Sequence, residues 1–156
     1  MLTIESASLE DAAIITSIKI KAFNKEINTY LGRNGGPPGY DDIDSERYII
    51  THFIAKKILL HNTIIGAFFL ILINETTMRF EDFVIAPTYQ GRGYGQQILS
   101  KLPLLYPDIQ EWQLSTPVFS IGNQHLYEKL GFHEVSRTDE EIEYKKIILN
   151  PPKYQR

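Results

Sequence analysis

The sequence predicts a mixed α/β fold, because segments with a helical pattern alternate with segments rich in strand-forming residues. Residues 9 to 27 repeat apolar side chains at intervals of three and four, which is the spacing of one helix face. Residues 63 to 73 are rich in Ile and Phe, as is typical of a buried strand. Farther along, a strand pattern over residues 77 to 85 leads into a glycine-rich turn and another helical run. A chain of 156 residues predicts a single domain spanning residues 1–156.

The amino-terminal segment combines a short strand with the first helix. Residues 2 to 6 alternate in polarity and predict the strand, and the helix follows over residues 9 to 27. Ser8 and Asp11 have the spacing of a capping box, in which the acidic side chain reaches back to the capping residue. The helix is expected to be amphipathic, with Lys19 off the buried stripe of Ala12, Ile15, Ile18 and Ala22.

A loop, a second helix and a hairpin follow. Residues 32 to 39 are dense in Gly and Pro, which sustain neither helix nor sheet. Asp42 or Asp44 can cap a shorter helix that reaches His52. Residues 53 to 73 then predict two strands joined at a His-Asn turn.

The remaining elements continue the alternation. Pro87 ends the strand over residues 77 to 85, and Pro103 is expected to kink or end the helix that follows the glycine-rich turn. Gly131 stands where a left-handed residue caps a short helix. The predicted carboxyl-terminal order is a strand at 110–116, a helix at 123–130, and a hairpin of 133–138 with 141–149.

Composition excludes several functional classes. The chain has no cysteine, so thiolate catalysis, disulfides and zinc-thiolate sites are ruled out. A net charge of −3 gives no general attraction to nucleic acids or anionic lipids. The first residues are acidic and resemble no targeting peptide, and the longest apolar run is too short for a membrane helix. We expect a cytoplasmic protein without a nucleic-acid or membrane partner, and the histidine spacing predicts no metal site.

The glycine-rich turn is the main chemical signal. A strand that leads through glycines into a helix converges its backbone amides on an anion, and a diphosphate fits best. In a dinucleotide-binding fingerprint counted from Gly91 and Gly93, the third glycine would fall at Gln96, which opposes a nicotinamide-dependent enzyme. A Walker loop fails as well, because Gln96 and Gln97 replace its Lys and Ser or Thr.

Two motifs resemble the GNAT superfamily of acetyl-CoA-dependent N-acetyltransferases. The first is Phe83-Val84-Ile85-Ala86-Pro87 followed by Gln90-x-x-Gly93-x-Gly95, which is similar to the family's acyl-CoA signature. The second is the segment from Asn123 to Phe132, with its Asn, Tyr and closing Gly-Phe. The resemblance implies a mixed, mostly antiparallel sheet that is splayed between strands 4 and 5 and flanked by helices.

The resemblance also implies how acetyl-CoA is bound. The pantetheine arm would pair with the backbone of the strand end, and the pyrophosphate would lie on amides of the glycine loop. Arg92 would add a charge-assisted contact, although a solvated loop arginine is the alternative. The expected coenzyme-binding residues are Phe83, Val84, Ile85, Gln90, Gly91, Arg92, Gly93, Tyr94, Gly95, Asn123 and Tyr127.

Each proton transfer of the reaction has a candidate residue. Glu81 is the candidate base, because in a regular strand it shares a face with Phe83 while Asp82 faces the other way. A bulge would exchange the two carboxylates; an ion pair with Arg79 and a water-mediated transfer are the alternatives. Tyr127 is the candidate acid for the departing thiolate, and Asn123 shares its helix face. A packed core aromatic is the alternative for Tyr127.

The acceptor is expected to be a primary amine, of a small molecule or a protein. In the family, the poorly matched loop near the glycines and prolines shapes the acceptor pocket, which makes Tyr30, Tyr40 and Asp41 candidates for substrate binding. Asp82, on the strand over residues 77 to 85, is a further candidate. For the acidic residues at 41 and 42, the start of a helix is the favoured alternative. A non-catalytic acyl-CoA-binding sensor is the rival function, and the chain is expected to act as a monomer or homodimer.

Overall fold

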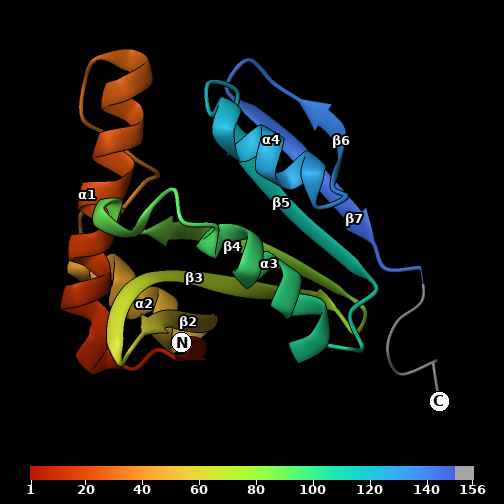
Figure 1. Ribbon diagram of the computed structural model, residues 1–156, viewed down its shortest axis with the longest axis horizontal. Coiled ribbons are helices and arrows are strands. Elements are labelled where there is room, and N and C mark those ends of the chain that lie inside the picture. The colour runs from red at the N-terminus through yellow and green to blue at the C-terminus, as the bar shows by residue number, and fades with distance from the viewer. Residues whose placement is uncertain (150–156) are drawn as a thin grey trace. The chain divides into compact units, whose positions relative to one another are not determined.

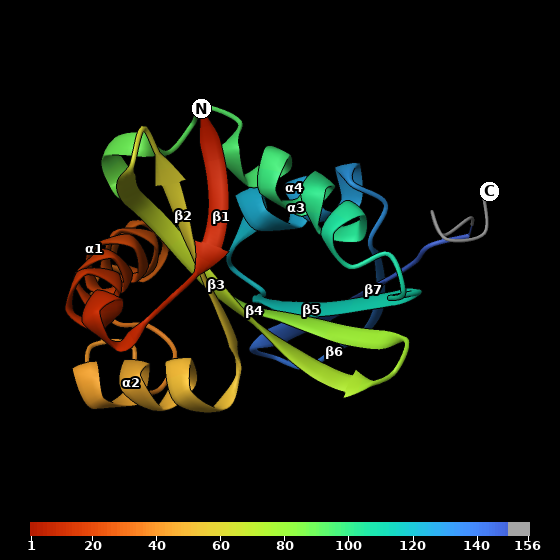
Figure 2. The same cartoon turned by 90° about the horizontal axis from the view of Figure 1, so that it is seen from below.

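The computed structural model describes residues 1–149. Their strands form one seven-stranded sheet in the order β1-β2-β3-β4-β5-β7-β6, with helices beside it (Figures 1 and 2). β4 and β5 run parallel, whereas β1 with β2, β2 with β3, β5 with β7 and β6 with β7 run antiparallel. The elements are β1 (Leu2–Ser6), η1 (Leu9–Asp11), α1 (Ala12–Leu31), α2 (Ile43–His52), β2 (Ile54–Leu60), β3 (Thr63–Asn74), β4 (Thr77–Ile85), η2 (Pro87–Tyr89), α3 (Tyr94–Leu105), β5 (Glu111–Pro117), α4 (Ile121–Lys129), β6 (His133–Arg137) and β7 (Glu141–Ile147). This is the mixed α/β fold that the sequence predicts.

The chain divides into two compact units. Among the described residues, the first unit comprises Met1–Leu70 and Asp82–Tyr94, and the second comprises Ile71–Glu81 and residues 95–149. In the first unit, α1 and α2 pack against each other. Its apolar core joins α1 to β3 and β4 through Ile15, Ile18, Ala22, Ala67 and Val84.

In the second unit, α3 and α4 lie on one side of β5 and β7 (Figures 1 and 2). Every second residue of β5 is buried, beginning with Trp112, so one face of this strand belongs to the core and the other is partly exposed. Tyr144 of β7 is among the most deeply buried side chains. Burial, and then the hydrogen bond that its hydroxyl donates to Glu128, raise the pKa of Tyr144 to about 12.

Local sequence signals for helix ends are confirmed. The backbone N–H of Ser8 donates to the carboxylate of Asp11 at 2.8 Å, so the predicted capping box is present. Asp42 caps α2. At the end of α4, Gly131 has a φ of 92°, and the N–H of Phe132 donates to the carbonyl of Tyr127 at 3.0 Å, which is the bonding pattern of a left-handed helix cap.

Several element ends differ from the prediction: α4 spans Ile121–Lys129 rather than 123–130, and β7 ends at Ile147 rather than at 149. α1 continues to Leu31 rather than ending near Ile27, because the left-handed residue that caps it is Gly32, with a φ of 69°. Of the two outcomes expected at Pro103, a kink or an end, the helix end is not observed, because α3 runs to Leu105; the kink stays a prediction. Pro103 has no N–H to donate to the carbonyl of Leu99, so the last turn of α3 lacks one helical hydrogen bond. Within residues 1–149, no helix has both the length and the apolarity needed to cross a membrane.

Candidate active site

The glycine loop has the backbone that the sequence predicts for an anion-binding turn. Gly91 and Gly93 have φ values of 77° and 80°, a left-handed conformation that residues with a Cβ rarely adopt. A Cβ on either residue would meet no atom within 4 Å, so the backbone angle, rather than lack of space, requires glycine. The loop leads directly into α3 at Tyr94, whose first amides lack partners within the helix. These residues fit a diphosphate.

Two polar side chains hold this loop in place. The amide of Gln90 donates to the carbonyl of Ile85 at 2.8 Å, and its oxygen accepts from the ammonium of Lys25 at 2.9 Å. Gln90 therefore ties the loop to the end of β4 and to α1. Arg92 donates to the carbonyl of Thr88 at 3.1 Å, and its guanidinium lies 5.4 Å from the centre of the Tyr89 ring.

The end of β4 departs from a regular strand at Asp82. This aspartate has a φ of 51°, which breaks the alternation of side chains between the two faces. The expectation of a regular strand, which placed Glu81 on the face of Phe83, is therefore wrong at this point. Beyond Asp82, Val84 is buried. The N–H of Ala86 donates to the carbonyl oxygen of Ile65 on β3 at 2.7 Å.

A buried lysine pairs with Asp82. The ammonium of Lys19 lies 3.0 Å from Asp82 Oδ2 and 2.6 Å from Glu46 Oε1, and its side chain is only 3% exposed. The expectation that Lys19 lies off the buried stripe is wrong, because carboxylates from α2 and β4 compensate its charge inside the first unit. The partners of Lys19 are distant in the sequence. The one local signal for its burial is its place four residues after the buried Ile15, on the same face of the helix.

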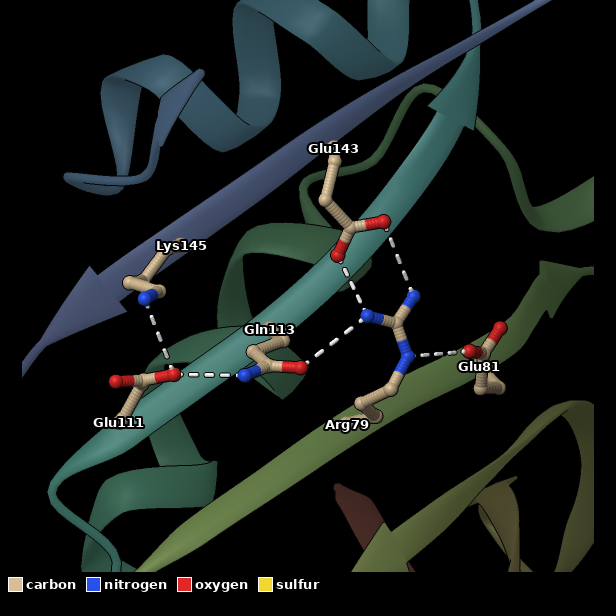
Figure 3. A network of polar contacts seen from close by, with 6 residues as sticks. All are labelled: Arg79, Glu81, Glu111, Gln113, Glu143 and Lys145. Atoms are coloured by element: carbon tan, nitrogen blue, oxygen red, sulfur yellow. Dashed lines mark hydrogen bonds and ion pairs between the residues drawn. The ribbon is translucent and has the colours of Figure 1, made fainter. Parts of the chain in front are cut away.

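In the second unit, Glu81 belongs to a polar network (Figure 3). Its Oε1 accepts from Arg79 Nε at 2.9 Å, and Arg79 also bonds both oxygens of Glu143. Gln113 connects this arginine to Glu111. The ion pair that the sequence offered as the alternative for Glu81 is thus present, and its role as a base stays a prediction.

Tyr127 and Asn123 lie four residues apart on α4. The Tyr127 side chain is buried, and its ring centre lies 6.0 Å from that of Phe132 and 6.0 Å from that of Tyr144. These contacts agree with the alternative of a core aromatic, and its role as an acid stays a prediction. Asn123 donates to the hydroxyl of Thr116 on β5 at 3.4 Å.

The predicted acceptor residues of the first unit differ in their surroundings. Tyr30 and Asp41 are exposed. The hydroxyl of Tyr40 donates to Asn24 Oδ1 at 2.7 Å, and the N–H of Gly35 donates to the same oxygen. Asn24 therefore anchors the glycine and proline loop on α1, a role that its position within a helical run did not indicate. Within residues 1–149, no group of three or more His, Asp or Glu residues is arranged to hold a metal ion.

One comparison with known proteins shows the family. The model of the acetyltransferase (GNAT) domain matches residues 49–134, whereas no curated protein sequence matches the chain. The PaiA N-acetyltransferase of Thermoplasma acidophilum, solved with coenzyme A, gives a TM-score of 0.76 at 14% identity over 95% of this chain and 99% of its own. The spermidine N-acetyltransferase of Vibrio cholerae, solved with CoA and spermine, gives 0.72 at 20% identity over 99% and 98%.

A third solved structure is that of an enzyme named for a different kind of acceptor. The ribosomal-protein-S18-alanine N-acetyltransferase of Escherichia coli gives a TM-score of 0.71 at 16% identity, over 95% of this chain and 94% of its own. At these identities, the three structures agree with this chain in fold. Two of their names give different acceptors, spermidine and a ribosomal protein, so fold similarity does not select one of them.

Proposed function

Because the chain belongs to the GNAT acetyltransferase family, we propose that it moves the acetyl group of acetyl-CoA to a primary amine by direct attack in a ternary complex. The observation that carries this proposal is the glycine loop, where left-handed Gly91 and Gly93 lead into α3. Amides in such a turn bind anions, and the helix dipole favours negative charge at that end. The diphosphate of coenzyme A is the matching ligand.

The strand and loop residues share the binding of the coenzyme. The backbone of Phe83, Val84 and Ile85 would pair with the pantetheine arm, and an N–H of Val84 or Ile85 would polarise the thioester carbonyl. Arg92 would add a charge-assisted contact. The pyrophosphate would be held by amides of Gly91–Gly95.

The attacking amine must lose a proton. For an alkylammonium with a pKa of about 10.4, releasing the lone pair at pH 7 costs about 4.6 kcal/mol, so a proton acceptor assists the reaction. We assign this role to Glu81, directly or through a water molecule, because its ion pair with Arg79 occupies only one of its two oxygens. Asp82 is assigned to binding of the acceptor.

The departing thiolate must gain a proton or a hydrogen bond. We assign Tyr127 as the donor, with Asn123 beside it on α4. From the reference pKa values of about 10 for a tyrosine and about 8.5 for a thiol, full proton transfer is uphill by roughly 2 kcal/mol. Tyr127 therefore acts mainly by hydrogen-bonding the sulfur.

Spermidine is the first acceptor to test, because one of the structural neighbours is named as a spermidine N-acetyltransferase. A peptide amino terminus is the second, following the ribosomal-protein enzyme. Tyr30, Tyr40 and Asp41, near the glycine and proline loop, are the proposed acceptor contacts of the first unit. The negative net charge of the chain is compatible with a cationic acceptor.

A thiol-release assay tests the proposal. The protein is incubated with acetyl-CoA and a panel of polyamines, amino acids and peptide amino termini, and free CoA is measured with DTNB. Tyr127→Phe is expected to lower kcat by about tenfold or more while the Kd of acetyl-CoA changes little, because the lost interaction belongs to the departing sulfur. The control is Tyr48→Phe, at an exposed tyrosine that stacks on His52. Tight binding of acetyl-CoA without thiol release from any amine would favour the non-catalytic sensor.

A further inference from the structure

Lys19 is buried in a place that an apolar residue would ordinarily occupy. It projects from the same region of α1 as Ile15, Ile18 and Ala22, which form the core of the first unit. An ammonium in such a place is costly unless charged partners compensate it. Glu46 at 2.6 Å and Asp82 at 3.0 Å supply that compensation. The Phe69 ring, whose centre lies 5.8 Å from the ammonium, adds a cation–π contact.

The three charged groups do not cancel. Two carboxylates share one ammonium, so the cluster of Lys19, Glu46 and Asp82 carries a net negative charge when all three are ionised. The carboxylates also differ in access, because the side chain of Glu46 is 6% exposed and that of Asp82 is 20% exposed. Solvent, or a ligand, therefore reaches the cluster mainly at Asp82.

Asp82 has both an unusual backbone angle and a side chain held by Lys19. A φ of 51° is uncommon for a residue with a Cβ, and it occurs one residue before the strand end that is proposed to hold the coenzyme. Asp82 Oδ2 accepts from Lys19, whereas Oδ1 makes no hydrogen bond within residues 1–149. One oxygen is thus tied to α1, and the other is available to a ligand.

We propose that Lys19 is a positioning residue for the transfer reaction: by holding Oδ2 of Asp82, it orients Oδ1 to accept a hydrogen bond from the ammonium of the acceptor amine. The inference rests on the proposed function and adds to it the residue that orients the acceptor-binding carboxylate. Lys19 itself does not contact the acceptor. Its removal should therefore affect binding of the amine more than binding of acetyl-CoA.

Calorimetric titration with spermidine, without acetyl-CoA, tests this inference independently of turnover. Lys19→Met is expected to weaken spermidine binding roughly tenfold or more, the loss typical of a hydrogen bond between charged groups. The Kd of acetyl-CoA should stay within about threefold of wild type, because Lys19 orients the acceptor-binding carboxylate and not the coenzyme. Lys19→Arg, which keeps the positive charge, should recover part of the spermidine affinity. If Lys19→Met fails to fold, the double variant Lys19→Met, Glu46→Gln takes its place. The second change removes the charge of Glu46, so fewer buried charges are left without a partner.

Lys57→Met is the matched control. Lys57 forms another partly buried ion pair in the first unit, with Asp11 at 3.0 Å, so its loss should lower stability without changing spermidine affinity. Unchanged spermidine affinity in both Lys19 variants, equal losses in Lys19→Met and Lys57→Met, or no spermidine binding by the wild type would each overturn the inference. If spermidine binds through Lys19 and Asp82 but no amine releases CoA, the proposed function fails and the inference stands.

Discussion

Among the glycines of the first unit, Gly66 of β3 is the one whose added Cβ would come closest to a neighbouring atom. A Cβ added to this residue would lie 2.4 Å from the carbonyl oxygen of Val84 and 2.9 Å from Cδ1 of Ile85. The nearer atom belongs to the backbone, so a change of side-chain rotamer cannot relieve the contact. Gly66→Ala must therefore displace the end of β4, where the coenzyme is proposed to bind.

The expected loss of stability follows from two opposing effects. Overpacking of a tight core costs typically about 1–3 kcal/mol, whereas replacing glycine restricts the unfolded chain and recovers about 0.4–1 kcal/mol. The net destabilisation is therefore roughly 1–2 kcal/mol, which lowers Tm by about 2–8 °C for a chain of this size. Because the displaced carbonyl is that of Val84, the affinity for acetyl-CoA should fall as well.

Thermal unfolding followed by circular dichroism, together with calorimetry for acetyl-CoA, measures both effects. The matched control is Gly122→Ala, because a Cβ on Gly122 in α4 would meet no atom within 4 Å, and alanine is the better helix former. The control should be at least as stable as wild type. A Gly66→Ala protein with unchanged Tm and unchanged coenzyme affinity would refute the close packing of β3 against β4.

Three further predictions address the loop, a buried carboxylate and a buried phenol. Gly93→Ala should weaken CoA binding about tenfold, because a left-handed alanine costs about 1–2 kcal/mol. The control is Gly32→Ala, which introduces similar strain at the end of α1 and should leave the CoA affinity measured by calorimetry unchanged. Burial alone would raise the pKa of Asp11, but the hydrogen bonds from Ser8 and the ammonium of Lys57 outweigh it and lower the pKa. Stability from Asp11 is therefore present above its unfolded pKa of about 3.9 and lost as pH falls through the folded pKa, so Asp11→Asn should flatten the acid limb of a urea-unfolding series. Tyr144 contributes stability that is present below its unfolded pKa of about 10 and lost as pH rises towards about 12, and Tyr144→Phe should remove this alkaline dependence in the same assay.

The sequence predicted those features of the fold that depend on neighbouring residues. The capping box of Ser8 and Asp11 and the cap at Gly131 each involve residues within a few positions of one another, so their spacing alone carries the information. The glycine loop is similar, because the need for positive φ at Gly91 and Gly93 is a property of the backbone. The order of elements followed in the same way from the polarity pattern of each segment.

Features that depend on distant residues could not be predicted in the same way. Lys19 has the polarity of an exposed helix residue, and its burial depends on Glu46 and on Asp82, which lies 63 positions away. Asn24 fits the middle of a helix, but it holds Gly35 and Tyr40 through one oxygen. In both cases the tertiary partner, and not the local pattern, determines what the polar side chain does.

The assignment of the two carboxylates of β4 brings these limits together. A regular strand would place Glu81 and Asp82 on opposite faces, and the left-handed backbone at Asp82 removes the basis for deciding their roles from alternation alone. Their partners provide a better basis, because Arg79 holds Glu81 in the second unit and Lys19 holds Asp82 in the first. The arginine is shared with Glu143 and the lysine with Glu46, so each carboxylate is oriented by a cation that another element also uses. The proposed division between a base at Glu81 and an acceptor ligand at Asp82 therefore depends on tertiary ion pairs. Variants of Arg79 and Lys19 should test this division more directly than variants of the two carboxylates.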